Sequence, residues 1–198
     1  MNPTLAKAAA NLKRRARSPL PAIWLMSDAK RLPDPETAMR ALPRGSALIL
    51  RHTDAGHLGR LARRLAPICL QRGVVLLIAG DWRLAASVGA AGVHLSEQAA
   101  HRGLAPGGRL WARRRIVTAA AHGARGLRAG KSTSAVLLAP VFATKSHPGR
   151  PALGAARTAA LVRIARGHVI ALGGISAATV NALRDSGCAG IAGIGFGL

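Results

Sequence analysis

Aromatic residues are scarce in this chain. Tyrosine is absent, and aromatic residues make up 3% of the 198 positions, although 49% are hydrophobic. The core must therefore be built mainly from alanine, leucine, valine and isoleucine, whose compact side chains suit close packing of helices on a sheet. A chain of this length is expected to fold as one domain.

Acidic residues are also few. Seven Asp and Glu stand against 29 Lys and Arg, which gives a formal net charge of +22. This charge favours polyanionic partners such as nucleic acid, an acidic membrane surface or phosphorylated metabolites. The arginines, however, recur along many helical stretches instead of forming one stripe with interleaved aromatic rings that stack on bases. A basic nucleic-acid-associated protein is therefore kept as an alternative function.

The sequence has two cysteines and no long hydrophobic run. No window holds the roughly 18 or more apolar residues that a membrane-spanning helix needs, and no signal-peptide pattern is present. Cys69 and Cys188 both lie in apolar surroundings, where a thiol usually serves packing. These absences predict a cytoplasmic enzyme-like domain without a transmembrane segment.

Residues 1–20 form a basic segment that differs from the rest of the chain. Lysines and arginines surround a run of alanines, and Pro19 and Pro21 then break any helix before the body of the domain, residues 21–198. The segment is expected to be a basic N-terminal helix or arm. It could lie on the domain, lie on a membrane surface or fray as a tail.

Eight short apolar runs predict eight buried parallel strands. Each has the length of such a strand and lacks a clean alternation of apolar and polar residues. Helical patterns separate the runs, which favours a right-handed β/α repeat. The expected strands are residues 22–26, 47–50, 74–78, 92–95, 116–119, 135–139, 168–172 and 189–194, and the expected helices are residues 36–42, 56–71, 84–88, a broken piece after Glu97, 121–129, 155–166 and 177–185.

Eight strands are what an α/β fold of the (β/α)8 TIM-barrel type requires, and about 200 residues is the lower size of this fold. The chain stops just after the eighth strand, so the usual closing helix is expected to be missing and the N-terminal basic helix is expected to cover part of the gap. An open doubly wound sheet is the alternative, but no Gly-x-Gly-x-x-Gly turn follows the first strand.

In such a barrel, function lies at the carboxyl ends of the strands. Four of the seven acids follow the first four strands: Asp28, Asp54, Asp81 and Glu97. Aspartate is also common in turns and helix caps, and this plain structural role competes with a site role, most of all for Asp28 and Asp54.

Two segments near the end of the chain predict anion binding. Residues 140–150 follow the sixth strand and combine hydroxyls and cations with Pro and Gly, which suits a lid over a phosphate. Gly173-Gly174-Ile175 ends the seventh strand, where a (β/α)8 barrel commonly binds phosphate through backbone amides.

Three motifs in collinear order resemble the thiamine-phosphate synthase and TenI family. They are Gly92-Val93-His94-Leu95, Ala139-Pro140-Val141-Phe142 with Thr144 and Ser146, and Ala171-Leu172-Gly173-Gly174-Ile175. The resemblance spans about residues 22–196 and implies a (β/α)8 barrel. It also implies thiamine biosynthesis, in which a transferase joins hydroxymethylpyrimidine diphosphate to thiazole phosphate while Mg²⁺ holds the diphosphate.

The resemblance also implies roles for individual residues. Arg51, Thr144 and Ser146 match positions that stabilise the departing diphosphate, and Gly173 and Gly174 match the thiazole-phosphate site. His147 and Gly195 stand at two further anion-binding positions, where the family has lysine and serine.

The chain departs from the family at the metal site. Gly80 and Ala99 replace the two customary Mg²⁺ carboxylates, and Asp81 and Glu97 stand one and two positions away. We expect these two acids to form a shifted Mg²⁺ pair, because Mg²⁺ commonly needs only one or two carboxylates plus substrate phosphate.

The TenI branch, a metal-free thiazole tautomerase, offers a second activity. It also has glycine at the position of Gly80, but its proton-transferring histidine is Pro140 here. His122, and with it His94, are the remaining acid/base candidates near the barrel mouth. A third possibility is a non-catalytic binder of a phosphorylated ligand. The expected partners are phosphorylated pyrimidine and thiazole molecules.

Overall fold

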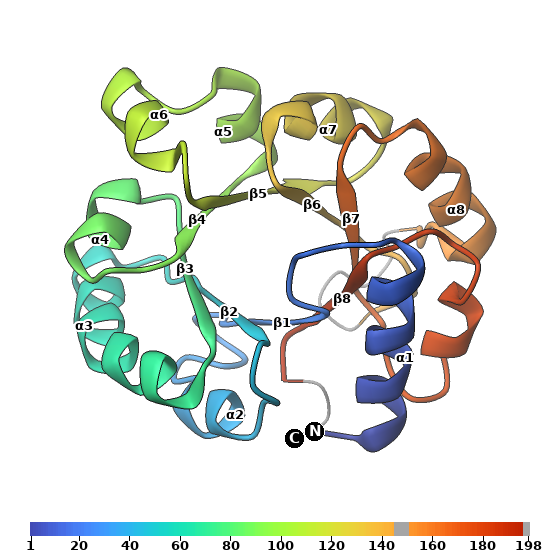
Figure 1. The fold of residues 1–198 in the computed structure, drawn as a ribbon, viewed down its shortest axis with the longest axis horizontal. Coiled ribbons are helices and arrows are strands. Elements are labelled where there is room, and N and C mark those ends of the chain that lie inside the picture. Colours follow the sequence, from blue (N-terminus) through green and yellow to red (C-terminus); the bar gives the residue numbers. More distant parts are fainter. Residues whose placement is uncertain (145–150, 196–198) are drawn as a thin grey trace.

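The chain folds into a closed barrel of eight parallel strands. The computed structural model describes residues 1–144 and 151–195. Each strand pairs with the next in sequence, and β8 pairs with β1 to complete the circle (Figure 1). The (β/α)8 prediction is confirmed. The strands are β1 (Ile23–Met26), β2 (Ala47–Leu50), β3 (Val75–Ala79), β4 (Gly92–Leu95), β5 (Ile116–Ala121), β6 (Ala135–Leu138), β7 (His168–Leu172) and β8 (Gly190–Gly193).

Alternate side chains along each strand enter two different apolar layers, because successive residues of a strand point to opposite faces. In β1, Trp24 packs with the inner cluster, whereas Leu25 packs with the cluster between the strands and the helices. In β2, Ile49 and Leu48 divide in the same way. Both faces are therefore buried, which explains why the strands read as unbroken apolar runs.

Helices surround the barrel in the order that the sequence indicates (Figure 1). The longest, α3, begins after Asp54, whose side chain accepts a hydrogen bond from the His57 amide, and ends at Gly73 with a φ of 65°. The helices are α1 (Pro3–Arg15), α2 (Glu36–Arg40), α3 (Ala55–Arg72), α4 (Trp82–Ser87), α5 (Glu97–Arg102), α6 (Pro106–Ala112), α7 (Ala124–Ala129) and α8 (Gly154–Ile164), with 3₁₀ turns η1 (Gly130–Ser132) and η2 (Val180–Leu183).

The helix predicted over residues 177–185 is wrong, because only the short 3₁₀ turn η2 forms there. The Thr179 hydroxyl donates to the Gly174 carbonyl at 2.8 Å and accepts from the Ser176 amide at 2.9 Å. Side-chain bonds of this kind satisfy the backbone locally and compete with a regular helix.

The basic N-terminal segment forms helix α1, which lies beside β8 and η2 (Figure 1). Leu5, Ala9 and Leu12 are buried and join the cluster that packs around the strands. Arg15 donates to Asp185 at 2.6 Å, although both side chains are more than half exposed. An exposed pair contributes little stability, so the apolar face is what holds α1 in place.

Both cysteines are buried and free. Cys69 lies on α3, and Cys188 comes just before β8. Burial raises the pKa of each thiol to about 11. This agrees with their expected packing role.

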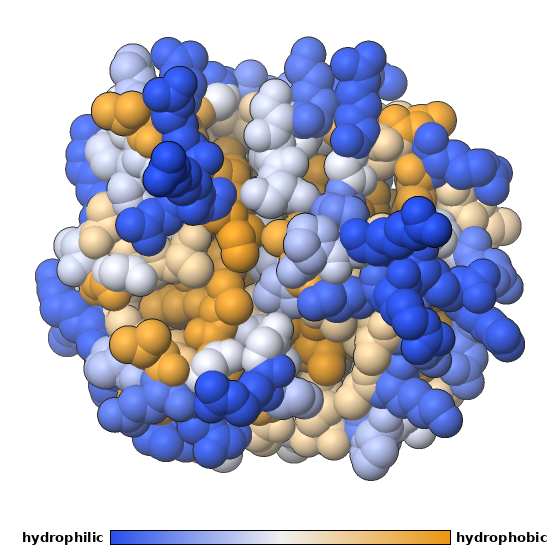
Figure 2. Space-filling view, in the orientation of Figure 1, coloured by the Kyte–Doolittle hydropathy of each residue, from blue (hydrophilic) through white to orange (hydrophobic). Residues whose placement is uncertain are grey.

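On the face shown in Figure 2, hydrophilic residues predominate at the edge. In the orientation of Figure 1, hydrophilic residues occupy the periphery of the molecule, while hydrophobic residues lie nearer its centre (Figure 2). Among the described residues, no helix is long and apolar enough to cross a membrane.

Replacing Leu12 with alanine tests how firmly α1 is held. Because Leu12 is 3% exposed, Leu12→Ala should lower the free energy of unfolding by about 2–5 kcal/mol, as for other buried leucines. Lys7→Ala, on the exposed face of the same helix, should change it by less than about 0.5 kcal/mol. Urea unfolding followed by circular dichroism measures both values, and equal values for the two variants would show that α1 is not docked.

Candidate active site

A cavity of about 450 Å³ opens at the carboxyl ends of the strands. Residues at the ends of all eight strands or in the segments that follow them contribute to its wall. The lining includes Arg31, Arg51, His94, Glu97, His122, Thr144 and Gly173, together with apolar side chains such as Met26, Leu137, Leu172 and Ile194. The structure thus brings several predicted site residues from distant parts of the sequence around one space.

Two arginines at this mouth share one carboxylate. Asp28 follows β1, and its Oδ2 accepts from Arg31 Nη2 at 3.2 Å and from Arg51 Nη2 at 3.1 Å. Asp28 also accepts from the backbone amides of Lys30 and Arg31 at 3.2 Å. Its carboxylate is therefore held by the local turn and in turn orients both guanidinium groups.

The Arg31 side chain beside Asp28 is the main reason that the pKa of this carboxyl falls to about 2. Asp28 therefore stays ionised at neutral pH. One negative charge faces two positive charges, so the cluster keeps a net positive charge at the cavity wall. Such a wall attracts anions. Arg31 is a site residue that the sequence motifs did not indicate, although its spacing of three from Asp28 is visible in the chain.

His94, from β4, lies on the cavity wall but is 6% exposed. Its Nδ1 lies 2.9 Å from the hydroxyl of Thr118 on β5. Burial, and then the nearby positive charge of Arg51, lower the pKa of His94 to about 4. The imidazole is therefore neutral at pH 7, so it can act as a hydrogen-bonding group or base and supplies no positive charge.

Glu97 and His122, which follow the neighbouring strands β4 and β5, form a pair at the mouth. The Oε2 atom of Glu97, at the start of α5, accepts from the His122 amide at 3.0 Å and lies 2.7 Å from His122 Nδ1. Both residues line the cavity. Glu97 thus fixes the position of the imidazole that the sequence suggested as an acid/base group.

The two acids predicted to bind Mg²⁺ make separate local contacts. Asp81 is exposed and caps α4 by accepting from the Leu84 amide at 2.9 Å, and Glu97 is bonded to His122. Within residues 1–144 and 151–195, no three His, Cys, Asp or Glu side chains gather that could hold a metal ion. These contacts do not fit a Mg²⁺ centre built by the pair, so their metal role stays a prediction without support from the geometry.

The glycines after β7 let the loops after β6 and β7 touch. The amides of Val141 and Phe142 donate to the carbonyls of Leu172 and Gly173 at 2.9 and 3.0 Å. Gly174 has a φ of 65°, and a Cβ there would lie 2.5 Å from the Ala143 carbonyl oxygen. Glycine is therefore required by both backbone conformation and space.

The amides of Gly173 and Gly174 donate to no acceptor within the described part of the chain. They are accordingly available for an anion. Gly195 follows β8 with a φ of 87° and has open space around its Cβ position. Thr144 lines the cavity. Ser146 and His147 lie outside the described residues, so their predicted roles stay predictions.

The fold and the site define a (β/α)8 barrel with a cavity at the carboxyl ends of its strands, whose wall carries two arginines anchored by Asp28. The family model described as thiamine monophosphate synthase matches residues 25–195. The chain belongs to this family, in agreement with the resemblance of its motifs.

Two curated relatives are called thiamine-phosphate synthase. The protein from Parasynechococcus marenigrum (strain WH8102) is 36% identical over 168 residues, which cover 81% of this chain and 46% of the relative. The protein from Laribacter hongkongensis (strain HLHK9) is 32% identical over 133 residues, which cover 66% of this chain and 62% of the relative. The chain thus spans less than two thirds of the length of either relative.

Solved structures support the fold. Thiamine phosphate pyrophosphorylase from Pyrococcus furiosus has a TM-score of 0.71 at 19% identity, covering 91% of this chain and 87% of the other. The protein of the same name from Bacteroides thetaiotaomicron has a TM-score of 0.60 at 17% identity, covering 89% and 83%. At these identities the likeness concerns the architecture alone.

The low pKa of His94 makes the stability of the folded chain depend on pH. Since the native pKa is about 4 and that of an unfolded histidine is about 6.5, the unfolded state binds more protons between these values. Stability should therefore fall as pH drops from about 6.5 to about 4. NMR titration should show the His94 ring neutral down to about pH 5; a midpoint near 6.5 would contradict the described burial.

A matched pair of glycine substitutions tests the contact between the two loops. Gly80 and Gly174 both have positive φ, but only at Gly174 would a Cβ meet another atom within 4 Å. Gly80→Ala should cost about 1–2 kcal/mol of unfolding free energy from backbone strain alone. Gly174→Ala should cost at least about 2 kcal/mol more, because overpacking is added. Equal losses in thermal or urea unfolding would mean that the loops do not touch.

Proposed function

We propose that the chain catalyses the thiamine-phosphate synthase reaction, in which hydroxymethylpyrimidine diphosphate and thiazole phosphate become thiamine phosphate and pyrophosphate. The observation that carries this proposal is the pair of arginines on Asp28 at the cavity mouth of a chain from this family. The carbon–oxygen bond to the diphosphate breaks, and the thiazole takes the vacated position.

Catalysis in this proposal comes from stabilising the charge that builds up on the leaving diphosphate. Arg51 and Arg31 line the cavity with their guanidinium groups anchored by Asp28, so little reorganisation is needed when the charge appears. The Thr144 side chain lines the same cavity and adds a hydroxyl. These three groups are proposed to hold the diphosphate.

The thiazole phosphate is proposed to bind at the amides of Gly173, Gly174 and Gly195. The positive φ of all three residues turns the backbone sharply at the ends of β7 and β8, and the (β/α)8 fold commonly places phosphate at this position. The apolar wall, which includes Leu137 and Leu172, provides a surface for the heterocycles.

The two histidines then serve different purposes. Neutral His94 presents a buried polar group in the cavity wall, fixed by Thr118. His122 is oriented by Glu97 and is the better placed proton acceptor or donor for a substrate in the cavity.

Mg²⁺ enters the proposal only as an ion carried with the diphosphate, since Asp81 and Glu97 do not build a site for it. A cytoplasmic location, expected from the sequence, also stays a prediction.

A non-catalytic binder of a phosphorylated ligand is the second candidate. The observation favouring it is that Gly80 and Ala99 leave their parts of the cavity wall without a carboxylate. The TenI-like tautomerase is less favoured, because the cavity presents Pro140 where that branch has its proton-transferring histidine.

Arg51→Ala should lower kcat/KM for thiamine phosphate formation by about 100-fold or more, as for the loss of one charge-stabilising donor. Arg64→Ala is the matched control, because Arg64 also pairs with one aspartate, Asp34, but does not line the cavity. It should change kcat/KM by less than about threefold, in line with a surface pair.

The assay follows thiamine phosphate by chromatography after incubation with both precursors and Mg²⁺. Absence of product above a control without protein would refute the transferase. A thermal shift on adding thiamine phosphate, together with no turnover, would support the binder instead. Equal losses in the Arg51 and Arg64 variants would refute the placement of Arg51.

A further inference from the structure

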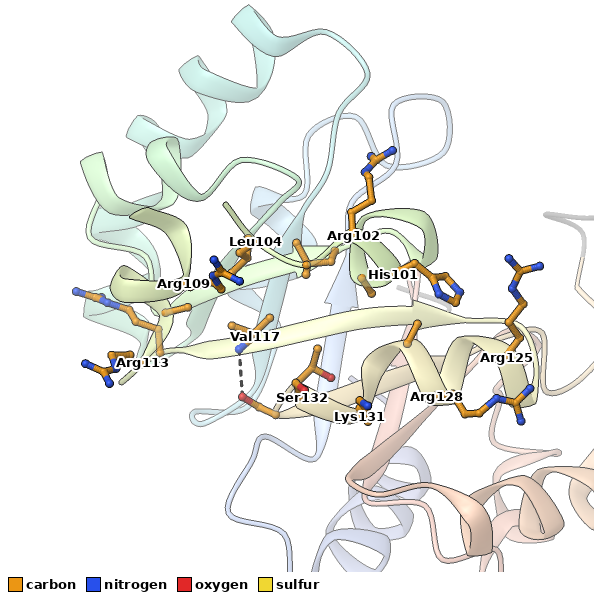
Figure 3. Close-up of a pocket in the computed structure, with 18 residues that line it drawn as sticks. His101, Arg102, Leu104, Arg109, Arg113, Val117, Arg125, Arg128, Lys131 and Ser132 are labelled. Atoms are coloured by element: carbon orange, nitrogen blue, oxygen red, sulfur yellow. Dashed lines mark hydrogen bonds between the residues drawn. The ribbon is translucent and has the colours of Figure 1, made fainter. Parts of the chain in front are cut away.

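A second and larger cavity, of about 880 Å³, lies on the outside of the barrel (Figure 3). It shares no lining residue with the cavity at the mouth. The crossover from β4 to β5 explains it, because the crossover is divided between two short helices, α5 and α6, which together leave part of β5 uncovered. Val117 of β5 is accordingly only half-buried and forms part of the floor.

Cations line both sides of this groove. Figure 3 shows side chains from α5, from α6 and from the residue just after α6 on one side of β5. Side chains from α7 and η1 lie on the other side. They are Arg102, Arg109 and Arg113 on the first side, and Arg125, Arg128 and Lys131 on the second. We call this set the β5 groove cations.

The β5 groove cations lack acidic neighbours. No Asp or Glu occurs in the sequence between Glu97 and Asp185, and none of the described residues that line the groove is an acid. Within the described residues, none of the six forms an ion pair with a carboxylate. A seventh cation, Arg115, is instead committed to the Ala90 carbonyl at 3.0 Å and to the Trp111 ring. Six positive charges thus stand together without compensation, which makes the groove an anion site.

The arrangement is linear. Arg113 precedes β5 and Arg125 follows it, so the cations extend along the whole strand. Six residues of parallel strand span about 20 Å. A compact anion such as a single phosphate would reach only part of this length.

We propose that the β5 groove binds the phosphodiester backbone of single-stranded nucleic acid. A nucleic-acid strand carries one phosphate charge on every nucleotide, so its backbone offers a continuous row of anions along the groove. An extended acidic peptide turns successive side chains to opposite faces, so only every second carboxylate would face the groove. Five of the six are arginines, whose planar fork matches phosphate oxygens.

The residues on the floor of the groove determine whether bound nucleic acid is recognised by its sequence. Among the described residues, the groove is lined by small or aliphatic residues such as Leu95, Leu104 and Val117, by the hydroxyl residues Ser132 and Thr133 and by the imidazole of His101, and no Phe, Tyr or Trp lines it. Bases therefore find no row of Phe, Tyr or Trp rings to stack on, a feature that sequence-tolerant single-strand binders otherwise use. Binding through this groove is electrostatic and independent of sequence.

Fluorescence anisotropy with fluorescein-labelled (dT)20 at about 150 mM NaCl tests the proposal. The combined variant Arg109→Gln/Arg128→Gln/Lys131→Gln should raise Kd at least tenfold. It should also reduce the slope of log K against log salt by about 2, because three phosphate contacts are lost. The control Arg60→Gln/Arg157→Gln/Arg163→Gln removes the same charge from exposed positions on α3 and α8 and should raise Kd less than twofold.

Three outcomes would overturn the proposal: equal weakening by both triple variants, absence of binding at this salt concentration, or equally tight binding of a labelled 20-residue polyglutamate. The last would assign the groove to an acidic protein segment. The Kd of a 20-mer of mixed sequence should lie within threefold of that of (dT)20. A larger difference would refute binding through the backbone alone.

Two further measurements separate binding from folding and from catalysis. The charge-preserving variant Arg109→Lys/Arg128→Lys should keep Kd within about threefold, with melting curves confirming that all variants are folded. Because the groove and the mouth share no residues, thiamine phosphate formation should be unchanged in every groove variant. If the groove variants lost both nucleic-acid binding and thiamine phosphate formation, the groove would not be a site separate from the mouth.

Discussion

Pairing of β8 with β1, with Ile23 opposite Ile191, closes the sheet on itself and brings the carboxyl ends of all eight strands to one rim. Residues that are far apart in the sequence meet only because of this closure. Arg51 follows β2, Glu97 follows β4 and Gly173 follows β7, yet all three line one cavity. The apolar layers on both faces of the strands hold the rim in place, so the polar site rests on a scaffold built almost without aromatic residues.

Charge is handled differently at the two cavities. At the mouth, Asp28 neutralises part of the positive charge of two arginines and fixes their positions, which suits binding of a defined small anion. On the outer groove no carboxylate is present, and exposed cations remain free to follow a long anion. The same excess of arginine over acid thus supports an organised site in one place and a diffuse one in another.

Strand positions could be predicted from the sequence because each strand is buried on both faces and reads as an uninterrupted apolar run. Residues 47–50, 92–95 and 168–172 were even bounded correctly. The helix expected over residues 177–185 failed because Thr179 bonds to nearby backbone groups, an effect that apolar periodicity does not contain. Arg31 was missed for a related reason, since its role depends on the fold of the turn at Asp28.

The two buried thiols of the folded chain are expected to react slowly. With pKa values of about 11, on the order of one sulfur in ten thousand is ionised at pH 7. Alkylating reagents and oxidants attack the thiolate, so the native barrel resists them without any disulfide. Cys69 packs in the helix layer and Cys188 at the entry to β8, and each becomes reactive only when its own region opens. The rates at which Cys69 and Cys188 are alkylated would therefore report separately on the local opening of α3 and of the segment before β8.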